Sequence, residues 1–139
     1  MSMHTFCVRV RYSETDVMGF LHHSNYARYY ETARWELFRN LGVPYNQLEQ
    51  DGYILPVISM NEKFVKPARY DEQLTIITKV KQVLSPRITF VYKMYNEQQE
   101  LINKAEIAVA FVNKKSGKVC DVPPCLLDRI AETVELTEK

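Results

Sequence analysis

The chain has 139 residues, of which 46% are hydrophobic and 25% charged, with only 4 glycines and 6 prolines. This size and composition exclude a disordered or fibrous protein, and predict one globular domain over residues 1–139 that needs no disulfide or metal to hold its core. The 18 basic and 17 acidic side chains leave a net charge of +1. Nucleic-acid-binding proteins usually carry a larger basic excess, so no nucleic-acid partner is expected.

In chain order, the first predicted elements are a strand, a polar loop and a long helix. The strand is expected over residues 4–12, where apolar and polar side chains alternate, and the loop over residues 13–24. The helix has an apolar stripe at three- and four-residue steps, formed by Tyr26, Tyr30, Ala33, Leu37 and Leu41. Ser24 or Asn25 is its expected N-cap, and Gly42 its C-terminal stop.

The remainder of the chain is dominated by strands. The expected elements are a short helix over residues 45–50, a strand-like run over 53–66 interrupted by Pro56, strands over 73–84, 87–95 and 101–113, and a C-terminal helix from Pro123 to about Val134. Consecutive strands with short connections favour an antiparallel sheet of about five strands packed on the long helix, an α+β fold. Apolar residues on both faces of residues 107–112 predict a strand buried on both sides, by the helix and by a partner subunit. One helix cannot cover such a sheet, so a second subunit is expected to cover the rest.

The cysteines and the N-terminus indicate the compartment. Cys7, Cys120 and Cys125 are an odd number and lack the C-x-x-C spacing of many metal and redox sites, which is typical of free thiols in a reducing compartment. Residues 1–6 lack the basic and apolar regions of a secretory signal. No apolar run approaches the ~18 residues that a transmembrane helix needs. A cytoplasmic protein without a transmembrane segment is therefore predicted.

The loop before the long helix concentrates reactive side chains. Asp16, Gly19 and the adjacent His22 and His23 all precede the start of the helix. A helix N-terminus presents unpaired amides and a partial positive charge. These properties suit a carbonyl oxygen that becomes negative during acyl transfer. The loop is therefore the candidate active site.

Two stretches of the chain carry a family resemblance. The first reads Tyr12-x-x-Thr15-Asp16-x-x-Gly19-x-x-x-His23-x-Asn25-Tyr26-x-Arg28-x-x-Glu31-x-x-Arg34, and the second reads Phe64-Val65-Lys66-Pro67-Ala68-Arg69-Tyr70-Asp71-Glu72. Together they resemble the 4-hydroxybenzoyl-CoA thioesterase family, most closely its Tol–Pal-associated branch, over nearly the whole chain. The resemblance implies the hot-dog fold, an antiparallel sheet wrapped around one long helix, in homodimers or homotetramers with active sites at the dimer interface. It also implies hydrolysis of acyl-CoA-type thioesters to free acid and CoA.

The same resemblance implies roles for individual residues. Asp16 matches the family's acidic residue and would act as general base or nucleophile on the thioester, with His23 orienting or assisting. The amides near His23 and Ser24 would bind the oxyanion. The substrate pocket would include Tyr12, Met18, Gly19, His22 and Tyr26. Met18 and His22 depart from the side chains that close relatives often carry, so no acyl-chain preference follows.

Further expectations concern phosphate binding, metal binding and one pair of charged side chains. The resemblance also implies that basic residues on the outer sheet edge meet the CoA phosphates, and the candidates are Arg87, Lys114 and Lys115. Adjacent histidines point in diverging directions and zinc sites favour other spacings, so neither a metal at His22 and His23 nor a cofactor is expected. Glu31 and Arg34, three residues apart on the helix, form either a surface ion pair or a structural contact.

Two other functions compete with thioester hydrolysis. One is a non-catalytic module that binds acyl groups or an acyl carrier protein, and the other is a hydratase on the same hot-dog fold. The presence of both Asp16 and His23 argues against the binding module, and the usual hydratase motif is not apparent. Both CoA and an acyl carrier protein fit as the thiol part of the substrate.

Overall fold

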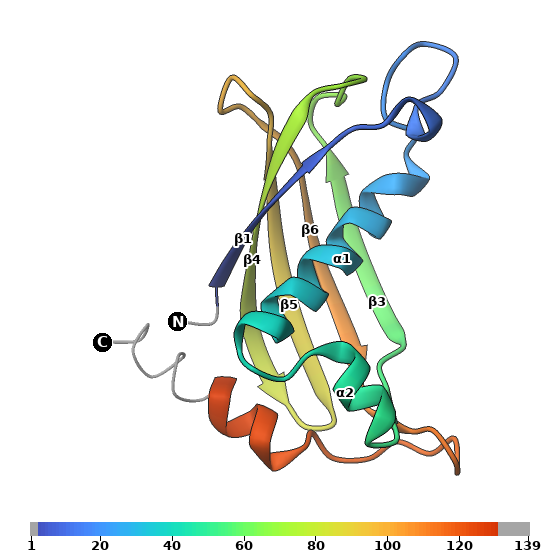
Figure 1. Cartoon of the computed structure of the whole chain (residues 1–139), viewed down its shortest axis with the longest axis vertical. Helices are drawn as coiled ribbons and strands as arrows, with labels where there is room; N and C mark the ends of the chain where they lie inside the picture. The colour runs from blue at the N-terminus through green and yellow to red at the C-terminus, as the bar shows by residue number, and fades with distance from the viewer. Residues whose placement is uncertain (1–2, 131–139) are drawn as a thin grey trace.

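The computed structural model describes residues 3–130 of the chain (Figure 1). Its elements are β1 (Met3–Arg9), a 3-10 turn (Tyr12–Glu14), α1 (Ser24–Asn40), α2 (Tyr45–Gln50), β2 (Tyr53–Ile54), β3 (Val57–Phe64), β4 (Gln73–Leu84), β5 (Arg87–Tyr95), β6 (Leu101–Ala110) and β7 (Val112–Asn113). Residues 124–130 form a further helix, and its expected end near Val134 lies outside the described residues. Within residues 3–130, no helix is both long and apolar enough to cross a membrane.

Five strands form one antiparallel sheet in the order β1-β4-β5-β6-β3, and α1 lies across one face of it (Figure 1). β2 and β7 pair separately as a two-stranded sheet. β1 and β3 are the two edges of the larger sheet. This arrangement confirms the predicted α+β fold, an antiparallel sheet of about five strands with one long helix.

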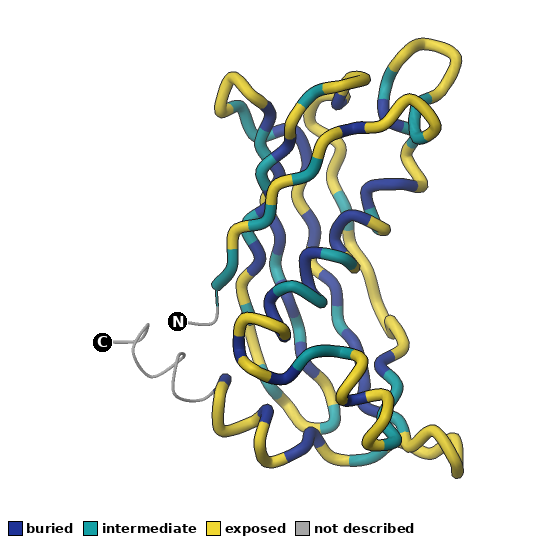
Figure 2. The backbone as a smooth tube through the Cα atoms, viewed as in Figure 1, coloured by how far each residue is buried: buried dark blue, intermediate teal, exposed yellow. Residues whose placement is uncertain are grey.

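The core lies between α1 and the face of the sheet that it covers, called the inner face below. The predicted helix stripe is confirmed, since all five members are at most 7% exposed: Tyr26, Tyr30, Ala33, Leu37 and Leu41. Along β4 and β5, fully buried residues alternate with more accessible ones, as expected for strands with one covered face (Figure 2). Each large apolar side chain buried in this way stabilises the fold by roughly 1.5–3 kcal/mol.

β6 is not buried on both faces along its whole length. Ile107 and Val109 are buried on the inner face, and Ala110 is buried at the end of the strand. Lys104 and Glu106 are exposed on the opposite, outer face. Charged side chains thus expose the outer face in the middle of β6. Over residues 107–112, to which the prediction applies, the outer face carries half-buried Ala108 and buried Ala110, and its burial by a second subunit stays a prediction.

One strand boundary differs from the prediction, and one predicted interruption is confirmed. The first strand ends at Arg9 instead of residue 12, because the following residues form the 3-10 turn, in which the Glu14 amide donates to the Arg11 carbonyl (2.9 Å). The run over residues 53–66 is interrupted at Pro56 as predicted and forms β2 and β3, because Pro56 has no N–H to donate to a neighbouring strand.

The N-terminal cap of α1 differs as well. His23 occupies the N-cap position, so the prediction of Ser24 or Asn25 is wrong. The Ser24 amide donates to Nδ1 of the His22 ring (3.2 Å), which supplies the acceptor that a cap side chain normally provides. At the other end, the predicted stop is confirmed, since Gly42 has φ +84° in the left-handed conformation typical of the residue after a helix.

Candidate active site

The loop between β1 and α1 folds back on itself in a tight turn. The Asp16 amide donates to the Phe20 carbonyl (2.8 Å), and the Gly19 amide donates to the Asp16 carbonyl (3.1 Å). Gly19 has φ +80°, while a Cβ added there would meet no atom within 4 Å. Glycine is therefore required by the backbone conformation and not by a lack of space. The turn fixes the position of Asp16.

The Asp16 carboxylate uses only one of its two oxygens in this turn. Oδ1 accepts hydrogen bonds from the Met18 amide (2.8 Å) and the Phe20 amide (3.1 Å). Oδ2 makes no hydrogen bond with any residue between 3 and 130. One oxygen therefore holds the side chain in place, and the other is available to a substrate.

The second resemblance stretch packs directly against this loop and the start of α1. The Leu21 amide donates to the Ala68 carbonyl (2.8 Å), and the Ala68 amide donates to the Tyr26 hydroxyl (3.2 Å). The Arg69 guanidinium lies over the Phe20 ring, 5.1 Å from its centroid. The fold therefore brings the two stretches together, although about forty residues separate Tyr26 from Ala68 in the sequence.

Glu14 ties the loop to α1, and sequence reasoning did not identify it. Its carbonyl accepts from the His22 amide (2.9 Å) and from the Asn25 side-chain amide (2.8 Å), and its carboxylate accepts from the Tyr29 hydroxyl (2.6 Å). Burial, and then this contact with Glu14, raises the pKa of the Tyr29 hydroxyl. No local pattern signals this role, because the partners lie on a different element.

At the start of α1, two backbone amides have acceptors in the preceding loop. The Ser24 amide donates to the His22 ring, and the Asn25 amide donates to the His22 carbonyl (2.9 Å). In the described part of the chain, the His23 amide has no hydrogen-bond acceptor. Of the two amides expected to bind an oxyanion, the His23 amide is thus the free one.

A hollow of about 290 Å³ adjoins these groups. It is lined by Asp16 and His23, the two predicted catalytic residues, and by Tyr26, a predicted pocket residue. The rest of the lining comes from residues to which sequence reasoning assigned no role: Phe20, Leu21, Phe64, Val65, Lys66 and Pro67. Four of these six residues belong to the second resemblance stretch. Their place in that stretch was the one sequence signal that could have identified them as site residues.

The other expected pocket residues lie outside this lining in the single chain. Tyr12 packs edge-on against Tyr70, with ring centroids 5.6 Å apart, and Met18 is 71% exposed. Gly19 forms the turn, and the His22 ring packs against the His23 ring, 4.2 Å between centroids. These four residues lie on the same connection between β1 and α1 as Asp16, and none of them lines the hollow.

Glu62 on β3 is a further acidic side chain within electrostatic range of His23. Burial raises the pKa of its carboxyl, while Asn103 and His23 act in the opposite direction. Its Oε2 atom has no hydrogen-bond partner among residues 3–130. In the same part of the chain, no group of at least three His, Cys, Asp or Glu side chains is placed to hold a metal ion.

The candidate phosphate-binding residues lie far from this loop. Arg87 begins β5, Lys114 and Lys115 follow β7, and all three are exposed. The turn between β4 and β5 and the loop that follows β7 lie at the end of the sheet opposite the loop that precedes α1 (Figure 1). Within one chain, the candidate phosphate-binding residues and Asp16 are therefore at opposite ends of the sheet.

Comparison with known proteins gives a consistent result. The sequence profile of the thioesterase-like superfamily matches residues 10–130. The Bacillus subtilis protein YneP, provisionally named an acyl-CoA thioesterase, is 34% identical over 111 residues that cover 80% of each chain. The acyl-CoA thioester hydrolase YbgC of Escherichia coli is 29% identical over 120 residues, or 86% of this chain and 90% of YbgC.

A solved structure matches the fold closely. The crystal structure of a DHNA-CoA thioesterase from Staphylococcus aureus superposes with a TM-score of 0.93 and 27% sequence identity. The superposition covers 98% of this chain and 93% of that one. The hot-dog fold expected from the resemblance is thereby confirmed.

Proposed function

The chain belongs to the thioesterase-like superfamily, and from this premise we propose that it hydrolyses acyl-CoA-type thioesters to free acid and CoA. One observation carries the proposal: a single hollow is lined by Asp16 and by His23 at the start of α1. A carboxylate beside a free backbone amide supplies what acyl transfer needs, a base or nucleophile together with an oxyanion donor. The activities in the names of YneP and YbgC support the same reaction.

In the proposed reaction, the Asp16 carboxylate acts on the carbonyl carbon of the thioester. Its Oδ2 atom either attacks this carbon or takes a proton from the water that attacks it. The His23 amide donates to the carbonyl oxygen as it becomes negative, an interaction typically worth about 3 kcal/mol. If Asp16 acts as base, water adds to the carbonyl carbon, the C–S bond breaks, and the proton held by Asp16 passes to the leaving thiolate. If Asp16 attacks, the C–S bond breaks to leave an acyl anhydride on Asp16, and water then hydrolyses the anhydride, releasing the free acid and supplying the proton for the thiol. In either case the His23 imidazole orients the substrate or assists the proton transfer.

The walls of the hollow indicate the kind of acyl group that fits. Most of the lining is apolar or aromatic, including Phe20, Leu21, Phe64 and Val65. Tyr26 packs edge-on against Phe64, with ring centroids 5.1 Å apart. Pockets of this composition bind apolar groups and use a few polar atoms for orientation. We infer an apolar aliphatic or aromatic acyl group.

The function is tested by steady-state thiol release from short-, medium- and long-chain acyl-CoAs and one aromatic acyl-CoA. We expect turnover of at least one substrate, and the best one identifies the acyl group. Absence of turnover with every acyl-CoA, by a folded oligomer, would contradict hydrolysis of CoA thioesters. The same acyl groups on an acyl carrier protein then distinguish a carrier-specific hydrolase from a binding module.

We also propose a homo-oligomer whose subunits meet at β3. This strand pairs with β6 on one side, and its other edge is open in the single chain. Five apolar residues along and just after β3 are 47–55% exposed: Val57, Ile58, Met60, Phe64 and Val65. An exposed apolar edge strand readily pairs with another chain, so a second copy of β3 is the expected neighbour.

Such pairing would also complete the site. Two β3 strands related by a twofold axis run antiparallel, so the Val57 end of one copy lies beside the Phe64 end of the other. The end of the sheet that carries Arg87 and Lys114 in one subunit then approaches the Asp16 loop of the other. In such a dimer, the candidate phosphate-binding residues of one subunit can contact the substrate that is bound at Asp16 of the other.

Met60→Lys is the test of this interface. A lysine in the middle of the paired edge places a charge among apolar side chains, so we expect the variant to be a monomer of about 16.3 kDa by light scattering, with activity lost in parallel. Leu127→Lys is the matched control, because Leu127 is also an exposed apolar residue but belongs to the helix at residues 124–130 and not to β3. A wild-type monomer at micromolar concentration would contradict the proposed interface.

We further propose that residues 1–139 act as a single domain in the cytoplasm. The buried residues of α1, the large sheet and the helix at residues 124–130 form one hydrophobic core. Cys7, Cys120 and Cys125 are free thiols, which suits a reducing compartment.

A further inference from the structure

The outer face of the sheet carries lysines that are in register on neighbouring strands. Lys63 on β3 is paired with Lys104 on β6, and Lys104 is paired with Lys93 on β5. Lys79 on β4 lies one position further along the face, opposite Val91. Residues directly opposite each other on one face have Cβ atoms about 5 Å apart, so three ammonium groups are crowded across three strands. Lys63, Lys79, Lys93 and Lys104 are together called the lysine row.

The positive charge of the lysine row is not neutralised by the protein. Glu106 lies on the same face, but its carboxylate pairs with Lys81 (2.7 Å). Within residues 3–130, no member of the lysine row forms an ion pair or a side-chain hydrogen bond. Like charges directly opposite each other destabilise a sheet. The whole chain has a net charge of only +1, so this local excess of positive charge indicates a site that binds an anion.

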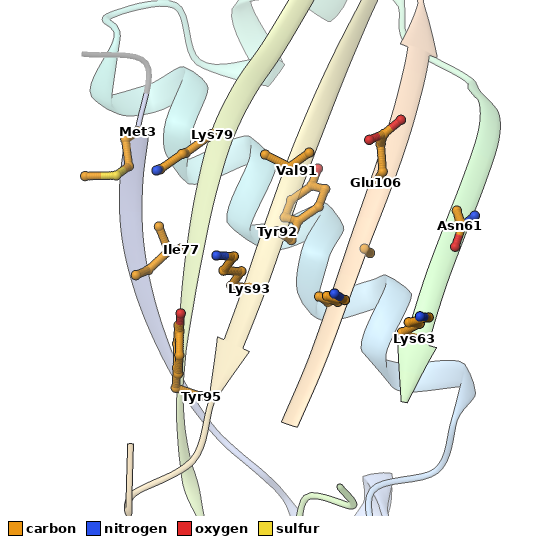
Figure 3. A pocket seen from close by; sticks show the side chains of 12 residues that line it. Met3, Asn61, Lys63, Ile77, Lys79, Val91, Tyr92, Lys93, Tyr95 and Glu106 are labelled. Carbon is orange, nitrogen blue, oxygen red and sulfur yellow. The ribbon is translucent and has the colours of Figure 1, made fainter. Parts of the chain in front are cut away.

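The lysine row surrounds a hollow of about 640 Å³ on the outer face (Figure 3). Figure 3 shows Lys79, Lys93 and Lys63 on three different strands around it, with α1 behind the sheet. Asn61 and Tyr95 add a polar and an aromatic side chain to the lining. Because α1 and Asp16 belong to the inner side, this hollow is separate from the candidate active site.

The dimensions of the row indicate the class of anion. From Lys93 to Lys63 the row spans two interstrand steps, or about 10 Å. That length matches two or three linked phosphate groups, to which lysines bind as point charges. The volume is in the range of small-molecule sites, roughly 300–1,000 Å³, and a concave site suits a small molecule better than a membrane surface. Tyr95 could stack against an attached ring.

We propose that the lysine row is a second site that binds a small soluble molecule with linked phosphates, such as a nucleoside diphosphate or triphosphate. The bound anion neutralises the facing ammonium groups and thereby stabilises the folded chain. Glu106 also lines the hollow, but its carboxylate is paired with Lys81. The site does not depend on the proposed hydrolase activity, because none of its residues lines the Asp16 hollow.

The test uses inorganic tripolyphosphate as the probe, with binding measured by calorimetry and unfolding followed thermally at low ionic strength. We expect the anion to bind wild type and to raise its unfolding midpoint. Lys104→Gln should weaken binding about tenfold, because Lys104 lies between two other lysines. Without the anion, this variant should unfold at a higher temperature than wild type, because the repulsion is relieved.

Arg39→Gln is the matched control, since it removes one positive charge from the exposed side of α1 and should leave tripolyphosphate binding unchanged. Asp16→Asn should also bind normally, which separates this site from catalysis. Loss of binding in Lys114→Gln but not in Lys104→Gln would overturn the proposal. The proposal would also be overturned if the lysine row bound anionic lipid vesicles or single-stranded DNA but did not bind tripolyphosphate.

Discussion

Asp16→Asn is expected to lower kcat/KM for thioester hydrolysis about a hundredfold or more while the protein stays folded. The substitution is nearly isosteric, and the asparagine oxygen can still accept from the Met18 and Phe20 amides that hold the turn. The free oxygen Oδ2 becomes an NH₂ group, which neither attacks a carbonyl carbon nor takes a proton from water. The loss should therefore reflect chemistry and not a disordered loop.

Thiol release with the best acyl-CoA measures this effect, and thermal unfolding confirms that the loop is intact. Asp16→Ala serves as the comparison, because it removes both the reactive oxygen and the acceptor for the two amides. We expect it to lose activity like Asp16→Asn and to lose stability in addition. If Asp16→Asn kept nearly full activity, Asp16 would be a turn residue alone and the proposed mechanism would be wrong.

The structure shows why a local pattern could not decide between these two roles. A loop aspartate commonly accepts hydrogen bonds from amides two or more residues ahead, and Oδ1 of Asp16 does so. The second oxygen takes no part in the turn. A structural role and a catalytic role are therefore compatible in one carboxylate, and catalysis by Asp16 stays a prediction.

Elements that depend on local periodicity could be predicted from the sequence. The apolar stripe from Tyr26 to Leu41 follows the helical repeat, and the alternation over residues 73–84 and 87–95 matches β4 and β5 as observed. The N-cap of α1 could not be predicted in this way, because the His22 ring takes over the capping contact from the side chains at Ser24 and Asn25.

Features that depend on pairing between strands could not be predicted. Each of Lys63, Lys93 and Lys104 has the pattern of an ordinary solvent-facing lysine in its own strand. Only the register between β3, β6 and β5 places the three opposite one another, and that register is set by contacts distant in sequence. The same limit explains why Phe64 and Val65 were not expected in the hollow beside Asp16.

Arg34→Ala is expected to lower the free energy of unfolding by about 3 kcal/mol or more. Arg34 is only 3% exposed, and its Nη1 atom donates to the Tyr92 hydroxyl (2.9 Å). Its guanidinium lies over the Phe90 ring, 5.9 Å from the centroid. These contacts decide between the two readings of the Glu31–Arg34 pair in favour of a structural contact between α1 and β5.

Removing the guanidinium leaves a cavity under α1 and a buried hydroxyl on Tyr92 without its donor, and both effects destabilise the fold. Glu31→Ala is the matched control, because Glu31 is half exposed and 4.0 Å from Arg34, so its loss should cost no more than about 1 kcal/mol. Denaturant unfolding at one fixed protomer concentration measures both variants, since assembly contributes to the apparent stability. Equal effects of the two substitutions would mean that Arg34 acts mainly through its ion pair and not through its buried contacts on β5.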